Sequence, residues 1–221
     1  MQKNKMKLGK RGQVTIFIIL GIIIIMIAVG TSYLRNEAFR EKIQSSLFRS
    51  AVVPEQAQGI VNFVSNCIQD IAKEGLVIMG EQGGYITIPN AILNNQRSYL
   101  QFTENIKIPY WLYGRDVTSN IPEISNMEKD LKNYIETRFK EECNLDVYEE
   151  LGYEISDNDI NVDVDFNKET ININLNSGLI AIIKEDEFDL GNYVLISVKS
   201  KLIEFYEMAN EIIDRELRNS P

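Results

Sequence analysis

Cys67 and Cys143 are the residues of this chain best suited to covalent chemistry, because two thiols can form one intramolecular disulfide. Each cysteine falls on the apolar side of a predicted helix. A disulfide between them would close a loop of about 76 residues and stabilise the fold by roughly 4 kcal/mol if the effect is one of chain entropy. The alternative is two separately buried thiols. We predict the disulfide, which would place the domain in an oxidising compartment outside the cytoplasm.

The carboxylates predict neither a metal site nor a catalytic site, although the chain has 32 Asp and Glu residues. The acidic run from Asp157 to Asp165 lacks the Gly and Glu that a calcium-binding EF-hand loop requires, and its alternation is typical of the solvated face of a strand. The chain has no histidine, which removes the commonest general base and the commonest metal ligand. We therefore expect no catalytic residue, no metal ligand, no cofactor and no enzymatic activity.

A candidate ligand surface lies in the region 85–113, which carries the aromatic residues Tyr85, Tyr110, Trp111 and Tyr113. Aromatic side chains combine apolar area with a polar edge, and they therefore suit ligand binding. The same residue types also fill cores and fix long loops. Both interpretations stay open on the sequence alone.

A stretch of 23 residues between Arg11 and Arg35 carries no charge and is rich in isoleucine. As a helix rising ~1.5 Å per residue, about 20 of these residues would span the hydrocarbon core of a bilayer. We predict a transmembrane helix over residues 13–34. A secretory signal peptide cleaved after Gly30 is the alternative.

Charge is divided unevenly on the two sides of this apolar stretch. Residues 1–36 carry six basic side chains and no acidic one, so the rest of the chain has 17 basic and 32 acidic residues. The total net charge of −9 is therefore the sum of +6 for residues 1–36 and −15 for the rest of the chain. The positive-inside rule predicts that the basic tip, residues 1–12, is cytoplasmic and that the rest is extracytoplasmic. The acidic outer portion argues against a nucleic-acid partner.

The uncharged apolar stretch begins within the segment Lys10-Arg11-Gly12-Gln13-Val14-Thr15-Ile16-Phe17. This segment resembles the N-terminal signal of archaeal type IV pilin-like proteins. The resemblance implies cleavage between Gly12 and Gln13 by a prepilin-type peptidase and a helix that forms the core of a filament. The fifth residue after that cut is Phe17, where the pilin pattern usually carries Glu. In pilins that acid is thought to neutralise the amino terminus of a neighbouring subunit.

A second resemblance rests on residues 64–68 (VSNCI), 82–86 (QGGYI), 108–111 (IPYW) and the late Cys143. These blocks resemble an uncharacterised family of archaeal single-pass membrane proteins. The resemblance implies the same architecture, with one membrane helix and an outer domain. It implies no particular activity.

The sequence after the membrane segment predicts an α+β ectodomain over residues 54–217, with helices packed on one face of a small antiparallel sheet. Residues 35–53 have apolar residues at helical spacing and are expected to form a helical stalk, with a linker as the alternative. Apolar residues at a period of 3.6 predict three helices: one from Pro54 that closes at Gly80, one from Pro122 to Cys143, and one from Leu202 to Leu217.

Alternation with a period of two predicts the strands of the sheet. A hairpin is expected from residues 160–166 and 171–175, and further strands are expected at residues 85–88, 179–183 and 193–198. Residues 89–121 show no regular period, and they are expected to form short strands or ordered loop.

These features together predict a single-pass, membrane-anchored cell-surface protein. Its expected role is structural, adhesive or pilin-like, with the lipid bilayer and homo- or hetero-assembly at the cell surface as its partners. The alternative is an extracytoplasmic module that binds an envelope component or ligand through the region 85–113. A membrane-tethered hydrolase is the least favoured of the three functions.

Overall fold

The computed structural model describes residues 53–104, 106–113 and 118–219. The chain divides into two compact units, residues 1–49 and 50–221, and all described residues belong to the second. Within the described ranges, no helix combines the length and the apolar character needed to cross a membrane. The predicted cytoplasmic tip (1–12), the membrane helix (13–34) and the stalk up to residue 52 lie outside the described residues and remain predictions.

Two long helices form one layer of the domain. Helix α3, Gln58–Glu81, follows a single 3-10 turn, Glu55–Ala57, and helix α5 is Ile124–Glu142. A methyl group added at Gly75 of α3 would lie 2.8 Å from Leu131 Cδ1 of α5, so this glycine lets the two helices approach closely. Both helices are predicted by the apolar spacing, but Gly80 lies inside α3, and the positive φ values that follow this helix occur at Gly83 and Gly84.

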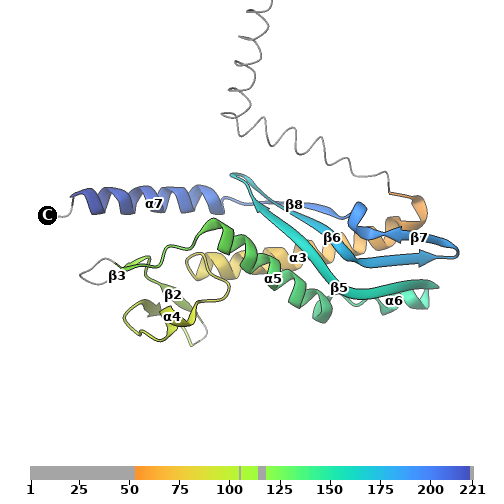
Figure 1. Cartoon of the computed structure of the whole chain (residues 1–221), viewed down its shortest axis with the longest axis horizontal. Coiled ribbons are helices and arrows are strands. Elements are labelled where there is room, and N and C mark those ends of the chain that lie inside the picture. Colours follow the sequence, from red (N-terminus) through yellow and green to blue (C-terminus); the bar gives the residue numbers. More distant parts are fainter. Residues whose placement is uncertain (1–52, 105, 114–117, 220–221) are drawn as a thin grey trace, which may run out of the picture. The chain divides into compact units, whose positions relative to one another are not determined.

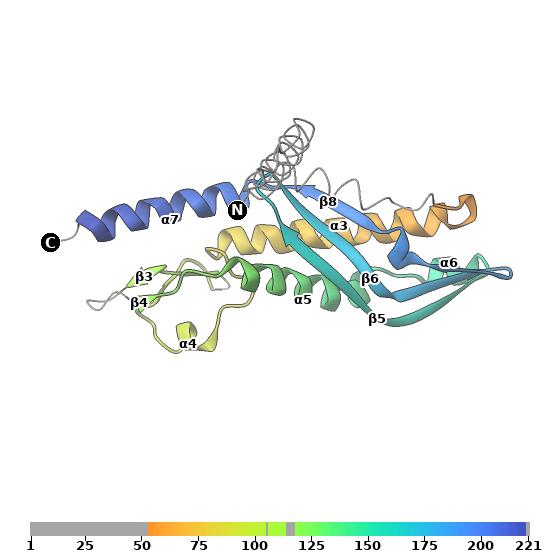
Figure 2. The ribbon, with the colours of Figure 1, turned by 45° about the horizontal axis from the view of Figure 1, so that its top comes forward.

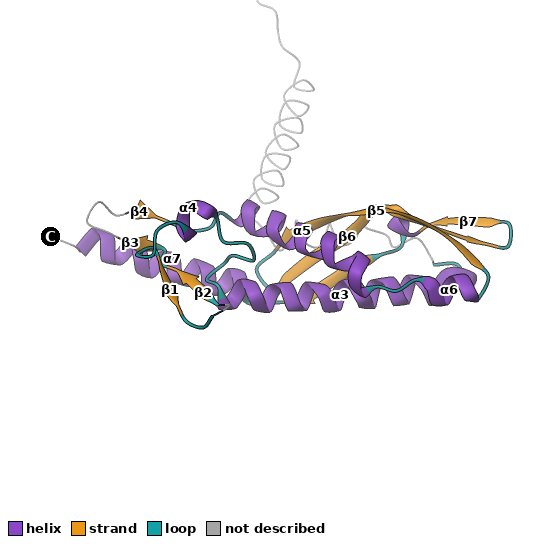
Figure 3. Cartoon of the chain, turned by 90° about the horizontal axis from the view of Figure 1, so that it is seen from below, coloured by secondary structure: helices purple, strands orange, loops and turns teal. Residues whose placement is uncertain are grey.

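The second layer is an antiparallel sheet centred on strand β6, Thr170–Ile183. Strand β5, Tyr153–Phe166, pairs with one side of β6 along its length. Strand β8, Leu195–Lys199, pairs with β6 residues 170–174, and strand β7, Asp186–Asp189, pairs with β6 residues 180–183. Helices α3 and α5 cover one face of this sheet, as Figures 1 and 3 show.

The core lies between the two layers and is almost entirely apolar. The helices contribute buried side chains at successive turns, and the strands contribute every second residue, as their period of two requires. In the two helices and the sheet, residues with at most 1% of their surface exposed are Ile60, Val64, Ile68, Ile71, Ala72 and Met79 of α3, Met127, Leu131 and Ile135 of α5, and Val162, Ile171, Ile173, Leu175, Leu179 and Ala181 of the sheet. The prediction of an α+β domain with helices on one face of an antiparallel sheet is therefore confirmed for these elements.

The prediction of a separate strand at residues 179–183 is wrong. Residues 171–175 and 179–183 belong to the single strand β6, because Asn176–Gly178 forms an irregularity opposite a bulge in β5 and does not reverse the chain. Gly178 has φ +105°, and a methyl group there would lie 2.7 Å from Ile160 Cα. Only glycine combines this backbone conformation with so close an approach of the neighbouring strand.

The predicted strand at residues 85–88 is also wrong. Side chains bind its backbone: Gln82 Nε2 donates to the carbonyl oxygens of Tyr85 and Ile86 at 3.3 and 3.0 Å. The Thr87 N–H donates to the Asp130 carboxylate at 3.4 Å. These bonds hold the segment as a loop, since its backbone groups find partners without a neighbouring strand.

The irregular region between α3 and α5 contains short elements only. They are helix α4 (Asn90–Leu93) and strands β1 (Tyr99–Gln101), β2 (Lys107–Pro109), β3 (Leu112–Tyr113) and β4 (Thr118–Ser119). β1 pairs with β2 and β3 pairs with β4, each as a two-stranded antiparallel ribbon. Tyr85, Ile88 and Ile92 form a small apolar cluster of their own, separate from the main core.

The two cysteines lie at disulfide distance and join the two long helices. Their Cα atoms are 6.0 Å apart and their sulfurs are bonded, linking the middle of α3 to the C-terminal end of α5. Short helix α6, Asp146–Glu150, follows Cys143, and Tyr148 of α6 packs on Phe63 of α3 with ring centroids 5.4 Å apart. The disulfide therefore fixes the point at which the chain leaves the helical layer for β5.

The last helix, α7, Leu202–Asn219, follows β8 after two residues. Ile203 is buried in the main core, and the Tyr206 hydroxyl donates to the Pro122 carbonyl oxygen at 2.9 Å. Beyond these two residues α7 runs past the end of the sheet, in the direction opposite to β7 (Figures 1 and 2). The predicted helix is thus confirmed, but it packs on the domain through its first turns only.

Candidate functional site

Two of the four aromatic residues of the predicted ligand surface, Tyr85 and Trp111, are bound through their polar atoms to backbone carbonyl groups. Tyr85 is 8% exposed, and its hydroxyl donates to the Asn120 carbonyl oxygen at 2.7 Å. Trp111 donates from Nε1 to the Gly83 carbonyl oxygen at 2.8 Å and packs on Tyr206 of α7. Both rings therefore act as internal supports of the loops that they belong to.

Tyr110 and Tyr113 are the other two aromatic residues of the predicted ligand surface. The ring of Tyr110 is 43% exposed, while the Tyr113 hydroxyl accepts a weak hydrogen bond from Asn95 Nδ2 at 3.4 Å. Among the described residues, no recorded contact joins either ring to Tyr85 or Trp111. Of the predicted ligand residues, Tyr85 borders the pocket at the first half of α5.

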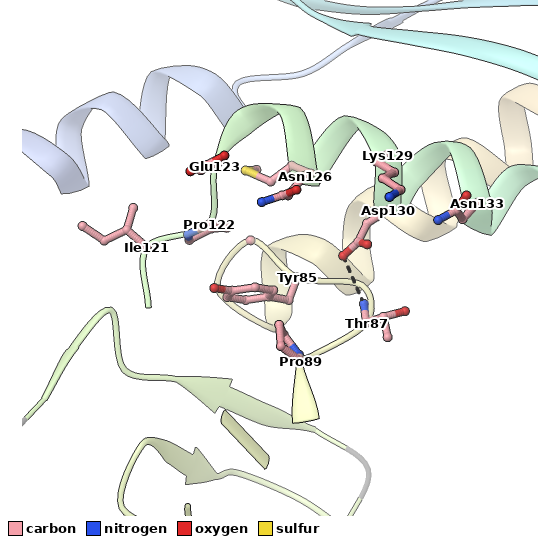
Figure 4. Close-up of a pocket in the computed structure, with 12 residues that line it drawn as sticks. Tyr85, Thr87, Pro89, Ile121, Pro122, Glu123, Asn126, Lys129, Asp130 and Asn133 are labelled. Atoms are coloured by element: carbon pink, nitrogen blue, oxygen red, sulfur yellow. Dashed lines mark hydrogen bonds between the residues drawn. The ribbon is translucent and has the colours of Figure 1, made fainter. Parts of the chain in front are cut away.

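That pocket lies between the 84–89 loop and the first half of α5 (Figure 4). Its volume is about 520 Å³. Tyr85, Thr87 and Pro89 line one side, and the opposite side is lined by the charged and amide side chains of Glu123, Asn126, Lys129, Asp130 and Asn133. Gly84 makes the close approach possible, because it has φ +100° and a methyl group there would lie 2.6 Å from Pro122 Cγ.

The electrostatics of the pocket centre on the Asp130 carboxyl. Burial raises the pKa of Asp130, although the Thr87 N–H that donates to it and the nearby Lys129 ammonium oppose this rise. Burial also raises the pKa of the Tyr85 hydroxyl, and the Asp130 charge adds to that effect. A half-buried carboxylate beside two amides can accept hydrogen bonds from hydroxyl or amine groups of a small ligand.

Replacing Asp130 with asparagine should raise the stability of the protein at neutral pH. A raised folded-state pKa means that Asp130 contributes stability below its unfolded pKa and loses it as pH rises through the folded pKa. Asparagine keeps an oxygen acceptor for Thr87 and carries no charge. We expect Tm to rise by about 1–2 °C at pH 7, a small effect typical of partly exposed sites, and the difference to vanish towards pH 4. Thermal unfolding across this pH range measures it, and a variant less stable than the wild type at pH 7 would contradict the stated cause.

The acidic run on β5 follows the outer face of the sheet, as its alternation predicts. Asp163 and Asp165 are exposed, and Asp159 forms an ion pair with Lys140 of α5. Within the described ranges, no three acidic or cysteine side chains converge in a way that could hold a metal ion. Hydrogen bonding to Lys140 is the main cause that lowers the pKa of the Asp159 carboxyl.

Side chains of α5 bind the free edge of β5. Glu136 Oε1 accepts from the Val162 N–H and Glu128 Oε1 accepts from the Phe166 N–H, each at 3.0 Å. Lys132 Nζ donates to the Val162 carbonyl oxygen at 2.8 Å. Sequence reasoning missed this arrangement, although the spacing of four residues between Glu128, Lys132 and Glu136 places all three on one side of α5. Because these edge groups have partners, β5 is a poor template for pairing with another strand.

Helix α7 carries four of the large apolar side chains that are exposed among the described residues, the fourth being Leu217. Phe205, Met208 and Ile212 are 61%, 51% and 56% exposed, and we call these three residues the α7 apolar face. Their spacing of three and four residues places them on one stripe of the helix. The sequence predicts an apolar stripe here that includes Phe205 and Ile212 in a helix packed on the sheet, because periodicity shows that a helix has an apolar face and not what covers it.

The proposed processing site, Gly12 and Gln13, lies outside the described residues. The chain matches no protein-family model, no curated protein and no solved structure.

Proposed function

We propose that this chain is a membrane-anchored, extracytoplasmic surface protein with a structural role, and that it joins an assembly through the α7 apolar face. The apolar segment 13–34 is the proposed anchor, and residues 1–12 are the proposed cytoplasmic tip. The proposed anchor begins in the segment Lys10–Phe17, which resembles the N-terminal signal of archaeal type IV pilin-like proteins. Phe17 at the position of the usual pilin acid favours a retained anchor over a filament core.

The observation that carries the assembly role is the exposure of α7. Large apolar side chains that stand together on a projecting helix cost free energy in water, since about 25 cal/mol is lost for each Å² left unburied. Such stripes mark protein–protein or membrane contact sites in soluble domains. The bound edge of β5 supports the same choice of surface, because it leaves strand pairing as the weaker route to assembly.

The bonded cysteine pair supports the location. Disulfides persist outside the cytoplasm and are rare inside it. Cys143 is 5% exposed and lies where α5 ends. The bond therefore links α3 to the end of α5, and without it only the packing of the core would hold these two elements together. A structural bond of this kind suits a domain that must stay folded outside the cell.

A second candidate function is the binding of a small polar ligand in the pocket at Asp130. The pocket is favoured over the aromatic residues of the region 85–113, because its amide and carboxylate groups face one volume. This function and the assembly role use different surfaces, so one chain can serve both.

The assembly role is tested by two serine substitutions in neighbouring positions of α7. Met208→Ser removes the central residue of the α7 apolar face, whereas Glu207→Ser alters the adjacent polar position with a similar cost in helix propensity. We expect the complex formed by the full chain in mildly solubilised membranes to lose mass with Met208→Ser and to keep it with Glu207→Ser. Equal masses for both variants and the wild type would contradict the proposal.

A further inference from the structure

The partner that fits the α7 apolar face best is identified by the charges that surround it. The first three turns of α7 carry only acids, Glu204, Glu207 and Glu211, whereas Arg215 and Arg218 both lie in its last turns. The helix has five acidic and two basic residues. Its polar side is therefore acidic at the beginning and mixed at the end.

This distribution disfavours a lipid surface as the partner. Helices that lie on membranes carry Lys and Arg on their polar side and are attracted to anionic lipids. Three of the four charged residues nearest the beginning of α7, from Lys201 to Glu211, are acidic. The apolar stripe alone would suit a membrane, but the acidic side chains beside it would be repelled by anionic lipids.

We infer that the α7 apolar face binds α7 of a second copy of this chain, with the two helices antiparallel. In this orientation Arg215 and Arg218 of each copy lie near Glu204 of the other, whereas a parallel pair would place acids beside acids. Arg215 is paired with Glu211 and Glu204 with Lys201, both in exposed bridges, and Arg218 Nε donates to the Asp214 carbonyl oxygen. Exposed bridges contribute little, so these side chains can exchange partners at small cost. The inference rests on the proposed assembly role and names its partner.

The geometry of α7 allows this pairing. Met208 and Ile212 lie on either side of the middle of the helix, so two antiparallel helices that overlap fully bring these side chains together at the centre. Ile203 and Tyr206 contact the domain and lie at least about 100° around the helix from each residue of the α7 apolar face, so this face points away from those contacts. An interface of about five turns is small, and we expect a weak dimer that confinement to a membrane would strengthen.

Single-cysteine cross-linking of the purified full chain in detergent tests both the partner and the orientation. The chain has two cysteines, which are bonded to each other, so an introduced cysteine is the one free thiol. In the antiparallel pair the two copies of residue 212 lie about 4–5 Å apart along the axis, and the two copies of residue 205 about 16 Å apart. A short bis-maleimide should therefore link Ile212→Cys chains severalfold more than Phe205→Cys chains.

Mixing variants completes the test. Phe205→Cys and Glu216→Cys chains should each link poorly alone and should link well when mixed, because residue 205 lies opposite residue 216 of the second copy. Glu207→Cys, on the opposite side of the helix, is the matched control that should not link. Efficient linking of Phe205→Cys alone would overturn the antiparallel orientation. Absence of linking at Ile212→Cys, if the complex in membranes still depends on Met208, would overturn the second copy as partner and leave the assembly role standing.

Discussion

Cys67→Ala is expected to lower the free energy of unfolding by about 4 kcal/mol, which corresponds to a fall in Tm of about 10 °C for a domain of this size. The bond between Cys67 and Cys143 closes a loop over a sequence separation of 76 residues, and opening it releases that loop in the unfolded chain. Alanine removes the bond without adding a polar atom beside the core. Thermal unfolding of the full chain, followed by circular dichroism, measures the change.

Reduction of the wild-type chain serves as the control for this prediction. A reductant should lower the Tm of the wild type towards that of Cys67→Ala and should leave the variant unchanged. Cys143→Ala and the double variant should unfold near the same temperature, because either single change already opens the loop. A wild-type Tm that is insensitive to reductant would show that the two thiols are not bonded in the protein.

Gly178→Ala is the second substitution with a large expected effect, and we predict a loss of about 3 kcal/mol. The positive φ of Gly178 strains any other residue, and a methyl group there would meet the backbone of β5 at Asp159 and Ile160. Backbone atoms cannot move aside as a side chain can, so the bulge of β5 would have to rearrange. Chemical denaturation gives the change in free energy directly.

Gly152→Ala is the matched control for this second prediction. Gly152 also has a positive φ, of +88°, but nothing lies within 4 Å of the position that its methyl group would take. Its substitution should cost only the backbone strain, about 1–2 kcal/mol. If the two variants lose equal stability, the close approach of β5 to Gly178 is not what requires glycine there.

The elements that the sequence predicts well are those whose apolar residues follow one period over many turns. α3, α5 and α7 each repeat apolar residues every three or four positions, and the β5–β6 hairpin alternates over most of its length. The pairing of Cys67 with Cys143 could be anticipated for the same reason, because both residues lie on those apolar stripes.

The errors arise where local composition and tertiary contacts disagree. Asn176-Ser177-Gly178 has the composition of a turn, but the approach of β5 makes it an irregularity within a continuous strand. Residues 186–189 are too acidic to suggest a strand, yet they pair with the end of β6 as β7. Residues 85–88 look like a strand and instead bind Gln82 and Asp130, which no local pattern reveals.

The two candidate sites also differ in how far the sequence predicts them. The pocket at Asp130 joins two segments more than 40 positions apart, so its existence depends on how α3 and α5 pack. The α7 apolar face is visible in the sequence as a stripe, and its exposure follows from the length by which α7 extends beyond the sheet. Periodicity therefore identifies the residues of an interface, while only the fold distinguishes an interface from a core.

Non-reducing peptide mass spectrometry of the chain recovered from membranes tests the central claim, that this is an anchored domain outside the cytoplasm. We predict an N-terminal peptide that begins at Met1 and a disulfide-linked peptide pair that contains Cys67 and Cys143. A chain that begins at Gln13 would still contain the membrane segment. It would show that a prepilin-type peptidase removes residues 1–12, so the anchor would not be the unprocessed one that we propose. A chain that begins at Thr31, or that carries both cysteines as free thiols, would contradict the account.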